Sequence, residues 1–290
     1  MDADSWASRI PPGICNYMNR LKPGFIGFIP KEADYYETIA KYASFGYQAV
    51  EHGGAAFRPG VNVAEHIAKL KALGLRHLTL DASVQNGNYP NVAELVSKCR
   101  AIEVDSVNVF HTSATAWRFA DRPEHPDEEE IMAELDRMNR LSTELAAEGI
   151  DLVFHNHDQE YLSTVNGVPL FWQMASMCPK LRFELDLAWI HYAGWNPAQL
   201  IRQLGSRVKV LHVKDYTRGE NYEYKPARTI TVPRYTTPGT GLVDLQECFQ
   251  AAVDVGVKWA VIEQDMQYNL NHEESVKTAY MIMKETGFVE

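Results

Sequence analysis

The chain contains 290 residues, of which 46% are hydrophobic, and its 28 basic and 38 acidic residues give a formal net charge of −10. This acidic balance argues against a nucleic-acid partner, which would need a basic surface to displace counterions from phosphate groups. The sequence shows no run of about 20 apolar residues that could cross a membrane, and its first residues lack the basic and apolar segments of a signal peptide.

Short apolar runs alternate with segments of helical periodicity along most of the chain, which indicates alternating strands and helices. Gly46, Gly74 and Gly149 each end a predicted helix. The predicted strands cover residues 24–30, 47–52, 76–82, 105–111, 151–157, 181–189, 207–215 and 259–265. The predicted helices cover residues 32–46, 63–74, 91–102, 127–148, 168–177, 197–204, 243–255 and 272–286.

Eight strands, each followed by a helix, predict an α/β fold of the (β/α)8 TIM-barrel type, built as a single domain. The competing fold is an open doubly wound sheet, which usually carries a glycine-rich phosphate turn after its first strand. No GxGxxG pattern follows residues 24–30. We expect an N-terminal arm over residues 1–23 and the barrel over residues 24–290. A long loop at 216–242 follows the seventh strand and suits a lid or a contact between subunits, with a plain surface insertion as the alternative.

The carboxyl ends of the predicted strands carry polar residues. In a barrel of this type, alternate residues of each strand point inward, and catalytic groups gather at the carboxyl ends. Six strands end on an acid or a histidine. These are Glu51 and His52 on the second strand, His111 on the fourth, His155 and His157 on the fifth, Asp186 on the sixth, His212 with Lys214 on the seventh, and Glu263 on the eighth. Val107 and Val109 share a face with His111, so we expect all three to point inward.

Such a convergence of acids and histidines predicts a ligand. Buried without partners, each of these groups would cost several kcal/mol, whereas a cation or a polyhydroxy ligand would satisfy them together. Carboxylates mixed with neutral imidazoles suit Mn²⁺, Zn²⁺, Co²⁺ or Mg²⁺. An open metal site can polarise a carbonyl while a neighbouring carboxylate or histidine moves a proton on the α-carbon. Sugar epimerases, aldose–ketose isomerases and some β-eliminating lyases use this chemistry.

Five segments resemble one protein group. The run FHNHDQEY (154–161) resembles the YHNHxxEF stretch found in a subgroup of the sugar phosphate isomerase/epimerase superfamily, the xylose isomerase-like TIM barrels. LDLAWIHYAGWNP (185–197) resembles its LDxxWxxxAGxDP segment, and VLHVKDY (210–216) its HxKD strand. PGTGLVD (238–244) is similar to its GxGxVD turn, and VIEQD (261–265) to its VEQD strand.

The resemblance implies one divalent metal ion, held by four side chains from strands five to eight. Mn²⁺ is the first expectation, with Zn²⁺, Co²⁺ or Mg²⁺ as alternatives. Asp186, His212 and Glu263 match three of the ligand positions. The fourth is usually a glutamate near the end of strand five, and this chain departs from that pattern. We expect His155 to replace it, with His157 as the alternative.

The resemblance also implies catalytic residues. Glu263 is expected to transfer protons as in the ketose 3-epimerases of the superfamily, together with His157 and Glu160 from the segment after strand five. Arg218, six residues after the expected ligand His212, matches a substrate-binding arginine of those enzymes.

Four further residues are expected to bind substrate, each with a structural alternative. Trp189 could stack against a sugar or cover the core. Lys214 could hold a substrate oxygen or form a salt bridge. Glu51 and His111 could bind hydroxyl groups or be paired interior residues.

The expected function is that of a divalent-metal-dependent isomerase or epimerase of a sugar, cyclitol or keto-sugar, working by proton abstraction α to a carbonyl. A lyase or dehydratase acting on a keto-sugar or 3-keto-glycoside at the same site is the first alternative, and a metal-deficient sugar-binding subunit is another. The acidic charge disfavours a DNA repair endonuclease, although that family shares the barrel.

Composition and the family resemblance together give the expected compartment and partners of the protein. Four scattered cysteines without a CxxC pair predict reduced thiols in a cytoplasmic protein. The expected partner is a small-molecule carbohydrate, with no nucleic acid and no membrane, and a homo-oligomer is left open.

Overall fold

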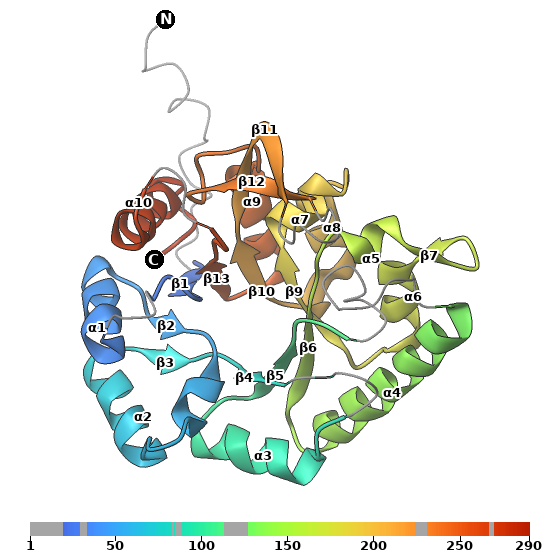
Figure 1. Ribbon diagram of the computed structural model, residues 1–290, viewed down its shortest axis with the longest axis horizontal. Coiled ribbons are helices and arrows are strands. Elements are labelled where there is room, and N and C mark those ends of the chain that lie inside the picture. The colour runs from blue at the N-terminus through green and yellow to red at the C-terminus, as the bar shows by residue number, and fades with distance from the viewer. Residues whose placement is uncertain are drawn as a thin grey trace, which may run out of the picture.

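The computed structural model describes residues 20–29, 34–82, 84, 89–112, 127–223, 231–266 and 270–290. Nine parallel strands form a nearly closed barrel with helices around its outside (Figure 1). The strands are β1 (Lys22–Phe25), β2 (Ala49–Val50), β3 (Arg76–His77), β4 (Leu80–Asp81), β5 (Ser106–Val109), β6 (Asp151–His155), β9 (Arg182–Asp186), β10 (Val208–Val213) and β13 (Trp259–Ile262). They pair in the order β3-β2-β1-β13-β10-β9-β6-β5-β4, which confirms the predicted single-domain TIM barrel.

The ninth strand arises because the predicted third strand is split. β3 pairs with β2, and β4 pairs with β5. Between them, the Leu78 carbonyl accepts a hydrogen bond from Ser106 Oγ at 3.1 Å, and the Thr79 carbonyl accepts one from the Gly53 amide at 2.9 Å. Hydrogen bonds from a side chain and a loop therefore replace the strand ladder at this seam of the barrel.

Most helices lie close to the predicted ranges, the short helices at 159–162 and 187–192 were not predicted, and most helix starts are capped. They are α1 (Tyr35–Phe45), α2 (Val63–Ala72), α3 (Val92–Ala101), α4 (Glu128–Ala147), α5 (Gln159–Leu162), α6 (Leu170–Met177), α7 (Leu187–Tyr192), α8 (Pro197–Leu204), α9 (Leu245–Val255) and α10 (His272–Glu285). Most begin after an Asp or Asn whose side chain accepts the amide three residues later, which satisfies a free N–H of the first turn.

The helix α7 corrects the prediction of a strand over residues 181–189. The strand ends at Asp186, and the carboxylate of Asp186 accepts the amide of Trp189 at 3.0 Å. The apolar run that follows is therefore helical. Short apolar runs fit a strand and a buried helix equally well, so periodicity could not separate the two.

Two apolar clusters show which strand faces point inward. A small cluster of Ile26, Ala49, Leu78, Val210 and Val261 lies inside the barrel, while a much larger cluster joins the sheet to the helices. Val107 and Val109 belong to the larger cluster, so the prediction that they point inward was wrong. Both faces of a barrel strand are buried, and here the apolar residues of β5 lie on the outer face while Asn108 points inward.

The segment after the seventh predicted strand is more ordered than a loop. It contains an antiparallel hairpin of β11 (Asp215–Glu223) and β12 (Thr231–Thr236), and residues 224–230 lie outside the described residues. A second hairpin, β7 (Thr164–Val165) with β8 (Val168–Pro169), precedes α6. Of the expected N-terminal arm, residues 1–19 lie outside the described residues, so the proposed division into arm and barrel stays a prediction. Within the described ranges, no helix combines the length and apolarity needed to span a bilayer.

Candidate metal centre

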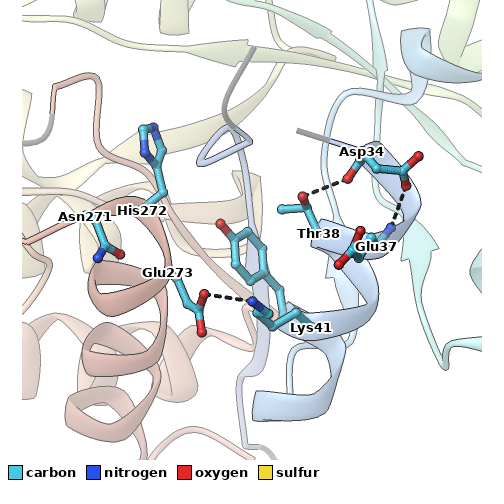
Figure 2. A pocket seen from close by; sticks show the side chains of 8 residues that line it. Asp34, Glu37, Thr38, Lys41, Asn271, His272 and Glu273 are labelled. Atoms are coloured by element: carbon cyan, nitrogen blue, oxygen red, sulfur yellow. Dashed lines mark hydrogen bonds and ion pairs between the residues drawn. The ribbon is translucent and has the colours of Figure 1, made fainter. Parts of the chain in front are cut away.

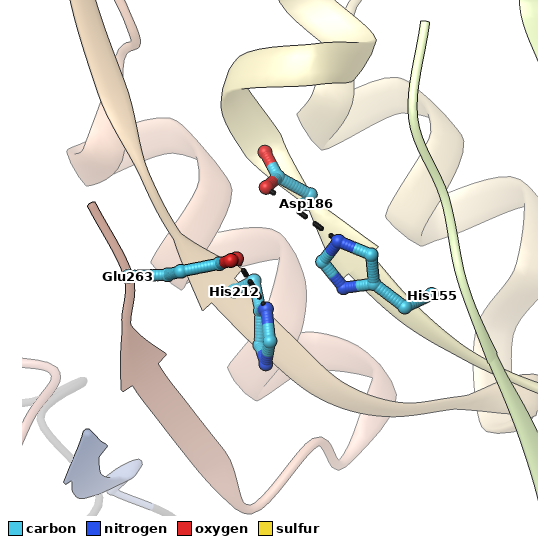
Figure 3. A group of neighbouring side chains, drawn as sticks. All are labelled: His155, Asp186, His212 and Glu263. Carbon is cyan, nitrogen blue, oxygen red and sulfur yellow. Dashed lines mark hydrogen bonds and ion pairs between the residues drawn. The ribbon is translucent and has the colours of Figure 1, made fainter. Parts of the chain in front are cut away.

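Four side chains from four neighbouring strand ends meet at one point. His155 ends β6, Asp186 ends β9, His212 lies on β10, and Glu263 directly follows β13. One ligand atom from each of them lies within 4.8 Å of all the others. Figure 3 shows the four side chains pointing toward one another. The structure therefore brings together the four residues predicted as metal ligands, including His155 in place of the glutamate usual on strand five.

The charge state of three of these residues fits a divalent cation. Burial lowers the pKa of His212, but Glu184, Glu51 and Glu263 outweigh it and raise that pKa well above the usual value, so His212 must release a proton to bind a metal. Burial, followed by the neighbouring His212, lowers the pKa of His155 well below its usual value, so its imidazole is neutral and can donate a lone pair. Burial opposes ionisation of Glu263, but Lys214 and His212 lower the pKa of its carboxyl well below the usual range. Burial raises the pKa of Asp186 to about 6, against the effect of Lys214. Two carboxylates and two imidazoles form a donor set suited to Mn²⁺, Zn²⁺ or Co²⁺.

A buried lysine lies against two of the four residues. Lys214 Nζ is 3.1 Å from Asp186 Oδ2, 3.2 Å from Glu263 Oε2 and 3.0 Å from Asp265 Oδ2. Burial lowers the pKa of Lys214, but these three carboxylates outweigh it and raise that pKa well above the usual value. The salt bridge expected as the structural alternative for Lys214 is present, while a contact with substrate stays a prediction.

A second polar layer supports His212 from inside the barrel. His212 Nε2 lies 2.7 Å from Glu51 Oε2 and 2.9 Å from Glu184 Oε1. Asn108 Nδ2 donates to Glu184 Oε1 at 2.7 Å, and Thr79 Oγ1 donates to Glu51 Oε1 at 2.9 Å. Glu51, expected to bind substrate, is only 1% exposed and contacts protein groups, so its substrate role stays a prediction.

The two carboxyl groups of this layer differ in charge. Burial and the neighbouring Glu51 raise the pKa of Glu184 to about 8, so Glu184 keeps its proton at neutral pH. Burial opposes ionisation of Glu51, but His212 lowers the pKa of Glu51 to about 2. An ionised Glu51 beside His212 Nε2 favours a proton on that nitrogen, which leaves Nδ1 facing the four-residue group.

The histidines of strands four and five line up beside this group. The His157 ring stacks on His111 with 4.4 Å between centroids, and lies 4.9 Å from His155 and 5.6 Å from Trp189. Burial lowers the pKa of His111 to about 4. Burial and His111 likewise lower the pKa of His157 well below its usual value, so both rings are neutral.

The two other predicted site residues lie in different surroundings. Glu160 is fully buried, and its Oε2 accepts the His157 amide at 2.6 Å, so it holds the turn that carries His157. A catalytic role for Glu160 stays a prediction. Arg218 is exposed on β11, and nothing in the structure tests its expected contact with substrate.

Comparison with known proteins places the chain in a family. The family model described as xylose isomerase-like TIM barrel matches residues 39–286. The chain belongs to this family. The family assignment agrees with the resemblance found in the sequence and with the barrel of parallel strands.

Three proteins illustrate the range of the xylose isomerase-like barrels that resemble this chain. An inosose dehydratase of Clostridium beijerinckii is 21% identical over 276 residues, which cover 89% of this chain and 92% of the relative. The structure of the IOLI protein with a bound zinc atom has a TM-score of 0.68 and 16% identity, over 92% of this chain and 98% of its own. The structure of D-psicose 3-epimerase from Clostridium cellulolyticum has a TM-score of 0.65 and 16% identity, and the match covers 92% of this chain and 99% of the epimerase. At these identities the two structures show that the fold is shared.

A pocket away from the metal group lies between two helices of the xylose isomerase-like barrel. It has a volume of about 410 Å³ and lies between the starts of α1 and α10 (Figure 2). Lys41 pairs with Glu273 at 2.8 Å there, and Asp34 caps α1. None of its lining residues belongs to the metal group, and the contacts drawn in it join or cap helices.

Sequence reasoning missed Glu184 and Asn108. Both lie in the middle of a strand, where an apolar core residue is the usual expectation, and both point inward beneath the predicted ligands. One signal was available for Glu184, because it stands two positions before Asp186 and must share its strand face.

Proposed function

We propose that this protein is a metal-dependent enzyme that abstracts a proton α to the carbonyl of a keto-sugar or keto-cyclitol. The observation that carries the proposal is the group of His155, Asp186, His212 and Glu263 at the carboxyl ends of four adjacent strands. In TIM barrels this face holds the active site. The zinc atom in the IOLI structure supports a divalent cation for this chain, with Mn²⁺, Zn²⁺ and Co²⁺ as candidates.

Glu263 is the proposed base. Its carboxyl is ionised because Lys214 and His212 outweigh the effect of burial on its pKa. Its side chain is 16% exposed, whereas those of Asp186 and His212 are fully buried, so Glu263 is the carboxylate of the group that can reach a substrate. A divalent cation held by these residues supplies Lewis acidity that makes the α-proton of a bound ketone more acidic.

Two reactions can follow this step, and we propose elimination as the first. The α C–H bond breaks, its electron pair forms a C=C bond, and the β C–O bond breaks to release water. Glu263 can take the α-proton and then give it to the departing oxygen on the same face of the substrate. One carboxyl group can therefore act as both the base and the acid of the elimination. The likeness to an inosose dehydratase supports this outcome.

Epimerisation or isomerisation is the second candidate, favoured by the fold shared with D-psicose 3-epimerase. Epimerisation needs a second group that returns a proton to the opposite face. The usual strand-five glutamate is absent, and His157 is the neighbouring residue proposed for this role. Because this reaction depends on a substitute for the missing carboxylate, we place it after elimination.

Product mass and deuterium uptake test the two reactions. The metal-loaded enzyme is incubated in D₂O with a panel of ketoses and keto-cyclitols. A product lighter than the substrate by one water supports elimination, while a product that differs from the substrate in mass only by incorporated deuterium supports epimerisation. The variant Glu263→Gln should lose either activity, and His157→Gln should lose epimerisation and keep elimination. Protein that binds no metal and exchanges no proton would contradict the proposal and favour a sugar-binding subunit.

A further inference from the structure

The turn between β12 and α9, in the connection that follows the seventh predicted strand, surrounds the carboxylate of Asp215. Asp215 Oδ2 accepts the amides of Gly239 at 3.0 Å and Gly241 at 2.7 Å. Its Oδ1 accepts the amides of Tyr216, Leu242 and Val243 at 2.9, 2.9 and 3.1 Å. Five backbone N–H groups thus point at a side chain that is fully buried.

This arrangement is an anion-binding nest, and the protein itself fills it. Successive backbone N–H groups form concave sites that bind phosphate in many proteins. TIM-barrel enzymes often bind a substrate phosphate with the loops after strands seven and eight and a nearby helix start. Here a Cβ atom on Gly241 would lie 2.3 Å from Asp215 Oδ1, so the backbone is fitted closely around the carboxylate. These five N–H groups are therefore not free for a substrate.

The helix start next to this nest is also filled. The α9 helix begins after Asp244, and the Asp244 side chain accepts the Glu247 amide at 2.9 Å. A negative group of the protein thus takes the position at which a helix start would attract phosphate.

The charge of the metal centre also disfavours an anionic substrate. Four carboxylates surround the centre, from Glu51, Asp186, Glu263 and Asp265, beside the protonated Glu184. Among the described residues, Lys214 is the one buried lysine or arginine. Its ammonium has three N–H donors and faces three carboxylates, so it has none left for a phosphate group.

From these contacts we infer that the substrate is an uncharged keto-sugar or keto-cyclitol rather than a sugar phosphate. The inference rests on the proposed function, because it concerns the substrate of the same site. Within the part of the β11–β12 hairpin that the structure describes, Arg218 and Arg234 are the exposed arginines that could hold a phosphate ester instead.

Matched substrate pairs test the inference. The metal-loaded enzyme is given neutral ketoses and their phosphate esters at equal concentrations, and both α-proton exchange and loss of water are measured in D₂O. We expect kcat/KM for a neutral member to exceed that of its ester by at least about 100-fold, because like charges brought together at a binding site cost several kcal/mol. An ester that exchanges as fast as its neutral partner, and loses this rate in Arg218→Gln or Arg234→Gln, would overturn the inference and leave the proposed function standing.

Binding calorimetry on the same pairs separates the two proposals if no compound reacts. Absence of both α-proton exchange and loss of water across the panel counts against the proposed function. Tighter binding of the neutral members would still support the uncharged substrate class. Equal or tighter binding of the esters would overturn it.

Discussion

His212 Nε2 lies 2.7 Å from Glu51 Oε2, although 161 positions separate the two residues in the chain. Strand two thus holds a side chain of strand seven from inside the barrel. This contact joins two layers, because the other ring nitrogen of His212 lies 2.7 Å from Glu263 Oε2 in the predicted metal group. Such a partner fixes which nitrogen of a histidine ligand faces the metal and raises the basicity of that nitrogen.

Glu51→Gln should therefore weaken metal binding without unfolding the barrel. Loss of a carboxylate partner behind a metal-bound histidine typically lowers metal affinity about 10- to 100-fold. The dissociation constant for Mn²⁺ can be measured by competition with a fluorescent chelator. Glu103→Gln, which alters an exposed salt bridge with Lys71, is the matched control and should bind Mn²⁺ like the wild type. Equal affinities in all three proteins would contradict the support role of Glu51.

Lys214→Met should destabilise the protein strongly in the absence of metal. Its removal leaves Asp186 and Glu263 without their buried cation, a change that costs about 3–5 kcal/mol in comparable buried pairs. A bound divalent cation can replace the lost positive charge, so Mn²⁺ should restore part of the free energy of unfolding. Urea denaturation with EDTA and with Mn²⁺ measures both effects. Lys209→Met, whose partly exposed lysine pairs with Asp151 at 2.8 Å, should cost about 1 kcal/mol or less and be indifferent to Mn²⁺.

The barrel could be predicted from the sequence because it depends on local patterns. Alternation of apolar runs with helical segments located all eight strand regions, including the seventh strand around His212. The split third strand could not be predicted, because the Leu78 and Thr79 carbonyls accept hydrogen bonds from Ser106 and Gly53, which are distant in the sequence. The face of β5 was misjudged for a related reason, since both its faces are buried and sequence alone does not tell which one holds Asn108.

The meeting of His155, Asp186, His212 and Glu263 was predicted from the sequence, but most of the contacts around them were not. The strand-end rule brings Asp186 and His212 together from positions alone, because parallel strands present their carboxyl ends on one face. Glu184 and Lys214 acquire their properties from three-dimensional neighbours. Nothing in the sequence indicates that Glu184 keeps its proton or that Lys214 faces three carboxylates.

His155→Glu should restore the usual strand-five carboxylate and make the stability of the protein depend more on metal. The new carboxylate would lie beside Glu184, whose Oε1 is 3.1 Å from His155 Nδ1, and beside Asp186. Repulsion should lower the melting temperature in EDTA, while a more negative site should bind Mn²⁺ more tightly and stabilise more at a given concentration. Thermal unfolding over a Mn²⁺ series measures the shift, and His155→Gln is the neutral control. A shift of the same size in wild type, His155→Glu and His155→Gln would argue against His155 as a ligand.

A chain of hydrogen bonds away from the metal group predicts how stability depends on pH. His77 Nδ1 lies 3.2 Å from the Val50 carbonyl, which can only accept, so this nitrogen carries the ring proton. In a neutral ring the other nitrogen is then an acceptor, and His77 Nε2 accepts from His66 Nε2 at 2.8 Å. His66 Nδ1 then accepts from Tyr36 Oη at 2.8 Å, and both rings are neutral. Burial and the neighbouring His66 lower the pKa of His77 to about 4.

Stability should fall as the pH drops from about 6.5 to about 4, because in this range the unfolded chain protonates His77 and the folded chain does not. The depressed pKa of His77 corresponds to about 3 kcal/mol over this window. Urea denaturation between pH 7.5 and 4.5 measures the slope in wild type and in His77→Gln, where we expect a shallower slope. Tyr36→Phe removes the end of the hydrogen-bond chain but keeps both histidines, so it should lose stability at every pH and retain the wild-type slope. An unchanged slope in His77→Gln would show that other groups govern the acid sensitivity.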